Sequence, residues 1–266
     1  MNFDRRRVNG PEITSDVFYA NESPQFTKNE REIRKVDEMR PICMFTSDGD
    51  VLKPGLISSA SGSTYFEAGN TKIACAVYGP KQIKNAAYSP TGRLNVEIKH
   101  SPFSSPVRRD AVRELDATHL SNQVTQSLLP SLRLEEYEKM QIDVFVTILE
   151  DDSLDFGLMG CITTAAGCAL ASAGLEMNGL VVGVALAIQS DRLLVDPTPS
   201  EVRESQGMMT VCTLPALTQI THIWQAGMLD LGGYKQALSI AESASRNIHT
   251  VIAKTLMNEA AISDDK

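Results

Sequence analysis

The chain has 266 residues, of which 42% are hydrophobic and 22% are charged, and its formal net charge is -8. This is an ordinary globular composition, long enough for one large domain or two small ones. The acidity argues against a free-standing nucleic-acid-binding protein, because such proteins are usually basic. The charge is uneven: residues 51–109 hold eight Lys and Arg against two Asp and Glu, whereas residues 110–266 hold nine against 21. The middle of the chain is therefore basic and the remainder acidic.

The polar N-terminal stretch is followed by short predicted strands. We expect residues 1–33 to form a polar arm. After it, alternating apolar residues recur between turn residues such as Gly69 and Asn70, which is typical of strands. Tight turns between consecutive strands predict an antiparallel beginning of the sheet. The predicted strands span residues 55–59, 64–68, 71–78 and 93–100.

Helices and strands alternate in the second half, which predicts a mixed α/β layout. Apolar residues at helical spacing predict helices over residues 117–132 and 233–258, with a C-terminal tail over 259–266. A helix predicted over 160–173 is rich in small residues, so we expect it to be buried against a sheet and to end at Gly174. The other predicted strands span residues 142–149, 181–188, 192–195, 208–214 and 218–224.

The cysteines are typical of buried free thiols in a reduced intracellular protein. Their number is odd, none forms a CxxC pair, and four lie in apolar surroundings. Cys161 and Cys168 share a helical face, but no histidine pair stands nearby to complete a zinc site. The N-terminus lacks the apolar stretch of a signal peptide, and the longest apolar run is too short to span a bilayer. The five cysteines are Cys43, Cys75, Cys161, Cys168 and Cys212.

No compact motif predicts an active site. The patterns HExxH, GxSxG and GxGxxG are absent, and the four histidines lie far apart without a paired Cys or Ser motif. The acidic cluster at residues 150–155 lacks the spacing of a calcium loop, so a solvated loop is the favoured interpretation. The Gly- and Ser-rich residues 59–63 lead into a strand instead of a helix, which favours a turn over a phosphate-binding loop.

Several segments nevertheless resemble, in the right order, the RNase PH family. This family comprises phosphate-dependent 3'→5' exoribonucleases and the related ring subunits of the RNA exosome. The start of the chain, DRRRVNGPE at 4–12, together with GMMTV at 207–211, is similar to a eukaryotic ring subunit. The resembling segments are RKVDEMRP at 34–41, GSTYFEAGNTK at 62–72, AVYGP at 76–80, IDVF at 142–145, ASAG at 171–174 and LVDPT at 194–198.

The resemblance implies an α/β (α+β) fold over residues 34–258, with mixed sheets, a central small-residue helix and a long C-terminal helix. It implies a hexameric ring built with other RNase PH-like subunits around a central RNA channel. It further implies oligonucleotide-binding cap subunits as partners and a location in the nucleus, the nucleolus and the cytoplasm. We expect no membrane association, no resident cofactor and no metal.

The positions that carry catalysis in active members are changed in this chain. An arginine pair that opens a helix there matches Leu115 and Asp116 here, and the stretch that matches the phosphate loop, residues 156–159, holds no arginine. In the two possible registers, the paired aspartates of active members fall on Val202 and Met208 or on Glu201 and Gly207. Because Val, Met and Gly side chains neither bind magnesium nor transfer protons, we predict no catalytic residue.

Two alternatives stay open at this point. The first is an active phosphate-dependent exoribonuclease in which Arg113, Glu201 and Glu204 replace the missing groups. Its release of nucleoside diphosphates would depend on phosphate. The second is a small-molecule α/β enzyme unrelated to RNA, which would be stable as a monomer or a homo-oligomer.

Basic residues in two loops are the candidate RNA contacts. Lys81, Lys84 and Arg93 flank the loop after Gly79-Pro80, which faces the channel in the family. Arg108 and Arg109 lie in the loop at 101–110. Contacts from these side chains to phosphate oxygens would be sequence-independent and sensitive to salt. The alternative is that they are ordinary solvated side chains.

Overall fold

A computed structural model describes residues 38–40, 42–43, 57–83, 89–105, 115–151, 155–189 and 192–264. Arg34–Lys266 forms one compact unit. The predicted arm over residues 1–33 lies outside the described residues.

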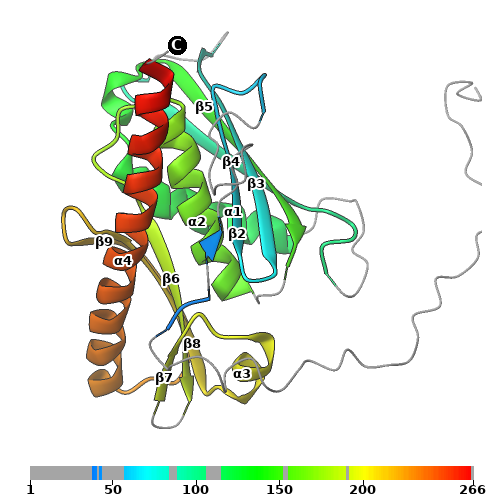
Figure 1. The fold of residues 1–266 in the computed structure, drawn as a ribbon, viewed down its shortest axis with the longest axis vertical. Coiled ribbons are helices and arrows are strands. Elements are labelled where there is room, and N and C mark those ends of the chain that lie inside the picture. The colour runs from blue at the N-terminus through cyan, green and yellow to red at the C-terminus, as the bar shows by residue number, and fades with distance from the viewer. Residues whose placement is uncertain are drawn as a thin grey trace, which may run out of the picture. The chain divides into compact units, whose positions relative to one another are not determined.

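The first sheet has five strands in the order β1-β2-β3-β5-β4 (Figure 1). β1, β2, β3 and β5 pair antiparallel, as predicted for the beginning of the sheet. β4 does not continue this meander: it pairs with β5, and in parallel. A parallel pair needs a long crossover connection, and the helix between β4 and β5 provides it. The strands span Ile42–Cys43 (β1), Gly62–Ala68 (β2), Thr71–Gln82 (β3), Arg93–His100 (β4) and Met140–Glu150 (β5).

One face of this sheet is buried and the other is open. Along β5, Ile142, Val144, Val146 and Ile148 are buried, whereas the residues between them are half-buried or exposed. This period of two is typical of a sheet with one solvated face. The crossover helix α1, Leu115–Leu128, contacts β4 and also reaches the second sheet.

The second sheet has four antiparallel strands in the order β7-β6-β8-β9. β6 and β8, which contact both α2 and α4, are buried along almost their whole length. This explains their nearly continuous apolar sequences. The strands span Val182–Gln189 (β6), Arg192–Val195 (β7), Gly207–Leu214 (β8) and Gln219–Gly227 (β9).

The predicted small-residue helix is α2, Asp155–Ser172, and it contacts both sheets. Its small side chains permit a very close approach: a Cβ on Gly183 of β6 would lie only 2.5 Å from the Cα of Gly160. A larger residue at either position would push the helix away from the sheet. Gly174 has a φ of +70°, which confirms it as the C-terminal glycine. The helix begins earlier than the predicted residue 160, at Asp155.

The long C-terminal helix α4, Leu231–Asp264, packs on β6 and β8 (Figure 1). It continues beyond the predicted end at residue 258, so most of the expected tail is helical.

Two local predictions were wrong, and one short helix was missed. Residues 57–59 of the strand predicted over 55–59 form a turn closed by the Ala60 N–H to the Ile57 carbonyl. The helix predicted to reach residue 132 ends at Leu128 and is followed by a 3₁₀ turn, Leu129–Ser131, in which Pro130 stands. The short helix α3, Pro199–Glu204, was not predicted, because six residues carry little periodic signal.

Candidate functional site

Three elements meet through aromatic side chains. Phe156, in the first turn of α2, stacks on Trp224 of β9 with ring centroids 4.0 Å apart and an angle of 19° between the rings. His119 of α1 lies 5.6 Å from the Trp224 ring. We call these three residues the aromatic junction. Its members come from the beginnings of two helices and from an edge strand, so it joins α1 and α2 to the second sheet.

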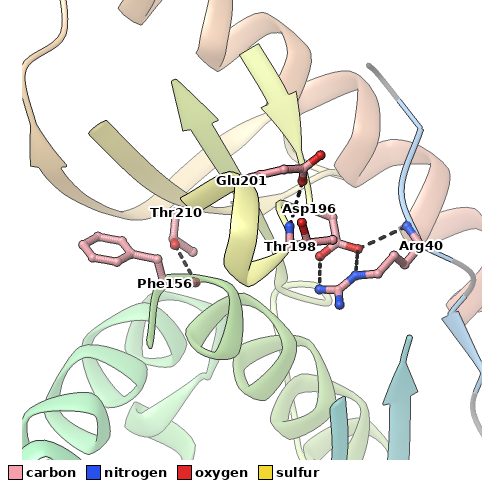
Figure 2. A network of polar contacts seen from close by, with 6 residues as sticks. All are labelled: Arg40, Phe156, Asp196, Thr198, Glu201 and Thr210. Atoms are coloured by element: carbon pink, nitrogen blue, oxygen red, sulfur yellow. Dashed lines mark hydrogen bonds and ion pairs between the residues drawn. The ribbon is translucent and has the colours of Figure 1, made fainter. Parts of the chain in front are cut away.

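Two hydrogen bonds reinforce the aromatic junction. The Thr210 hydroxyl of β8 donates to the Phe156 carbonyl at 2.7 Å (Figure 2). Nε2 of His222 in β9 lies 2.7 Å from Oε1 of Gln123 in α1 and donates to it. Burial lowers the pKa of His222, so this imidazole is neutral at physiological pH. The polar groups that link these elements are therefore already paired with each other.

A buried ion pair lies at the end of β7. The Arg40 guanidinium forms a two-pronged contact with Asp196, through Nε to Oδ2 at 2.9 Å and Nη2 to Oδ1 at 2.7 Å (Figure 2). The Arg40 backbone N–H also donates to Asp196 at 3.1 Å. Both side chains are less than one-tenth exposed. The pair fixes the segment before β1 to the second sheet.

The carboxylate of Glu201, one of the candidate acids, is used to cap a helix. Its Oε2 accepts a hydrogen bond from the Thr198 backbone N–H at 2.8 Å, as part of a reciprocal capping box at the start of α3 (Figure 2). Glu204 is exposed on the same helix and lies 3.4 Å from the amide nitrogen of Gln189. Arg113, the third replacement group considered from the sequence, lies outside the described residues.

The other matched positions whose side chains the structure describes carry apolar groups or no side chain. Gly207 and Met208 begin β8 and are buried, and Val202 lies in α3. In α2, Leu158 and Met159 are fully buried core residues. Leu115 and Asp116 begin α1, and their side chains lie outside the described residues. The structure therefore brings together the beginnings of α1 and α2, but it joins them by aromatic and amide groups.

The structure places two of the five predicted RNA contacts. Lys81 is exposed on β3 and Arg93 is exposed on β4, and both pair across the sheet with Gln141 of β5. They therefore lie in one cross-strand row on the same face. Lys84, Arg108 and Arg109 lie outside the described residues.

Sequence reasoning missed the aromatic residues of both regions. Phe145 and Tyr78 lie beside the basic row, with ring centroids 5.7 Å apart. The alternation over 142–149 carried a signal for Phe145, since it falls on the face opposite Ile142 and Val144. No such signal marked Phe156 or Trp224, whose contact depends on the packing of distant elements.

The cysteines fit the predicted buried thiols. Cys75, Cys168 and Cys212 are buried and Cys161 is half-buried, and none of these four described cysteines forms a disulfide. Burial raises the pKa of the Cys161 and Cys212 thiols to about 12, and that of Cys75 further still. Such thiols stay protonated and unreactive at neutral pH. Cys43 belongs to β1, and its side chain lies outside the described residues.

The described residues contain neither a membrane-spanning helix nor a metal cluster. None of their helices combines the length and the apolar character needed to cross a membrane. Among the same residues, no group of three or more His, Cys, Asp or Glu side chains is arranged to hold a metal ion.

Two sheets packed around a buried small-residue helix place the chain in the mixed α/β class. The fold matches the crystal structure of Rrp46 from rice with a TM-score of 0.72, covering 85% of this chain and 99% of that chain at 18% identity. Sequence profiles of the 3' exoribonuclease family match domain 1 at residues 51–176 and domain 2 at residues 179–244. The chain belongs to this 3' exoribonuclease (RNase PH) family, which confirms the expected fold.

Two curated relatives extend over almost the whole chain. Exosome complex component mtr3 of Schizosaccharomyces pombe is 29% identical over 270 residues, which cover 98% of this chain and 99% of that protein. Exosome complex component MTR3 of Mus musculus is 30% identical over 286 residues, which cover 97% and 96% respectively.

Proposed function

We propose that this chain is a non-catalytic structural subunit of the hexameric ring of an RNA exosome. It supports 3'→5' RNA processing and degradation by holding the ring together and lining the channel that leads RNA to a nuclease elsewhere in the complex. Its partners are other RNase PH-like ring subunits, oligonucleotide-binding cap subunits and RNA. Its location is the nucleus and nucleolus, and also the cytoplasm. The full-length similarity to exosome components supports this role.

The aromatic junction is the observation that carries the proposal. Phosphorolysis needs cationic or amide donors that hold inorganic phosphate beside the scissile bond. Here the first turn of α2 carries Phe156, and its ring is stacked on Trp224. A stacked hydrocarbon ring offers no hydrogen-bond donor to a phosphate.

The acid–base positions support the same conclusion. The Glu201 carboxylate is held by the Thr198 backbone N–H, and Gly207 and Met208 offer no group that titrates. Loss of one general acid or base alone lowers a rate by about 10² to 10⁴. With the matched phosphate donors replaced as well, we expect no phosphorolysis through these positions.

Co-purification and activity measurements test the proposal together. A tagged full-length chain should co-purify with other RNase PH-like chains in a complex far heavier than one 29.0 kDa chain. The purified chain should release no nucleoside diphosphate from RNA in phosphate buffer. A monomer or homo-oligomer would contradict the ring assignment. Phosphate-dependent release that is abolished by Glu201→Gln would instead establish an active exoribonuclease.

A further inference from the structure

The open face of the five-stranded sheet carries aromatic and basic side chains on three neighbouring strands. They are Tyr78 and Lys81 from β3, Phe145 from β5 and Arg93 from β4. We call these four residues the outer-face group. Both rings and both cations belong to paired strands whose other face is buried in the core.

The aromatic rings of this group are accessible and fixed in orientation. Phe145 is 37% exposed, although it stands in the centre of a strand. Its ring meets the Tyr78 ring edge to face, at 72° and 5.7 Å between centroids. The Lys81 ammonium lies over the Tyr78 ring, 5.0 Å from its centroid. Tyr78 is thus held from two sides, while Phe145 presents an open surface.

The two cations are not neutralised by the described residues. Neither Lys81 nor Arg93 forms an ion pair with any residue that the structure describes. Both side chains are exposed, and they stand one strand to either side of Gln141. Two strand spacings put their backbones about 10 Å apart.

The acidic groups on the same face are already partnered. Asp143 Oδ1 accepts hydrogen bonds from the side-chain amides of Asn95 at 3.2 Å and Gln141 at 2.6 Å. Glu97, which pairs across the sheet with Phe145, forms an ion pair with Lys99 at 3.0 Å. Around Phe145 on this face, the three cations Lys81, Arg93 and Lys99 stand against the two carboxylates Asp143 and Glu97, so the net charge there is positive.

We propose that the outer-face group is a stacking platform for single-stranded RNA, in which one base stacks on Phe145 while Lys81 and Arg93 contact phosphates. This inference rests on the proposed function, and it assigns RNA contact to the sheet face in addition to the loops. Exposed aromatic rings beside cations are how proteins bind single strands without sequence preference, because every base has a flat π-face. A purely anionic ligand would need the cations but not Phe145.

The test separates stacking from charge on the full-length chain, in the ring formed with its co-purified partners. The probes are a fluorescent oligouridine and an abasic RNA of equal length, which keeps the phosphates and lacks the bases. Phe145→Leu should weaken oligouridine binding about tenfold and leave abasic RNA binding unchanged. Phe145→Tyr, which keeps a ring, should retain wild-type affinity.

The double variant Lys81→Gln, Arg93→Gln should weaken both probes. It should reduce the slope of log affinity against log salt by about 1.4, because each phosphate that a cation neutralises on a single strand adds about 0.7 to that slope. Lys254→Gln is the matched control, because this lysine is also exposed but belongs to α4 and not to the strands of the outer-face group. It should change neither the affinity nor the slope.

Several outcomes would overturn the platform. One is that wild type and Phe145→Leu bind oligouridine with equal affinity. Another is that Phe145→Leu weakens the binding of abasic RNA as much as it weakens the binding of oligouridine. A third is that protein neighbours protect Phe145 from hydroxyl-radical footprinting in the ring without RNA, which would make this face a protein interface. If no ring forms, the proposed function fails, and the same variants measured on the full-length chain alone still decide the platform.

Discussion

Two aromatic pairs of this protein have similar chemistry but different surroundings. Phe156 and Trp224 lie half-buried and stacked at the junction of α1, α2 and β9, where they hold distant elements together. Tyr78 and Phe145 lie on the open face of the first sheet, where one ring stays accessible. The first pair is committed to the fold and the second is available to a ligand.

The charged groups of the two regions differ in the same way. Arg40, Asp196 and Glu201 are bound to internal partners, whereas Lys81 and Arg93 have no ion-pair partner among the described residues. A group that contacts an external ligand must keep donors or charge that the fold has not used. Substitutions in the first region should therefore change stability, and those in the second should change binding.

Asp196→Ala should have the largest effect on stability. It leaves the Arg40 guanidinium buried without its carboxylate, which typically costs about 3–5 kcal/mol of unfolding free energy. Urea unfolding of the full-length chain measures the loss. Glu176→Ala is the matched control, because it breaks an exposed pair with Arg133 and should cost less than about 1 kcal/mol. Equal effects of the two variants would show that the buried pair is not a structural link.

Trp224→Ala should be the next most costly substitution. It removes the ring that Phe156 and His119 contact, and a half-buried tryptophan should cost about 2–3 kcal/mol, below the range of a fully buried one. Trp224→Phe preserves an aromatic partner and should recover much of the loss. Because Trp224 is the sole tryptophan, its emission reports the stack directly, and Phe156→Ala should shift that emission to longer wavelength. An unchanged spectrum would contradict the stacked arrangement.

Glu201→Ala should cost about 1 kcal/mol, the usual value of a helix cap. RNA degradation by the assembled complex should not change, since the proposed role of this carboxylate is structural. Thr198→Ala removes the other half of the capping box and is expected to cost a similar amount. A large loss of activity in Glu201→Ala, with stability retained, would favour the catalytic alternative.

His222 should make stability depend on pH. Its pKa is lowered in the folded protein from the ordinary value of 6.5, so below about pH 6.5 the unfolded chain binds the additional proton more readily. Stability should therefore fall as the pH is lowered from 7 to 5, and His222→Gln should reduce that fall. Urea midpoints measured across this range test the sign, and a steeper pH dependence in His222→Gln would contradict it.

Lys81→Gln and Arg93→Gln should have the smallest effect on stability. Both side chains are exposed and lack ion-pair partners among the described residues, so each change should stay within about 0.5 kcal/mol. The same variants should weaken RNA binding with a reduced salt dependence, in contrast to Asp196→Ala. A stability loss comparable to that of Trp224→Ala would show that these residues belong to the structural core.

Much of the fold could be predicted from local patterns. The alternation over residues 93–100 gave β4 with its bounds, because each strand residue faces core or solvent in turn. The small residues of α2 predicted its burial, since only such a helix can approach β6 as closely as Gly160 approaches Gly183. The pairing of β4 with β5 could not be predicted, because a helix separates the two strands in the chain and no local pattern specifies which edge β4 joins.

The sequence by itself determined the family, the buried thiols, the central helix and the basic character of the middle segment. It also predicted that the catalytic positions of active members are changed in this chain. Only the tertiary structure decided that Phe156 stacks on Trp224, that Arg40 neutralises Asp196, and that Lys81 and Arg93 share one row. The physical reason is that composition and periodicity fix what each segment can bury. Strand register and helix packing decide which side chains meet, and hence which of them stay free for a ligand.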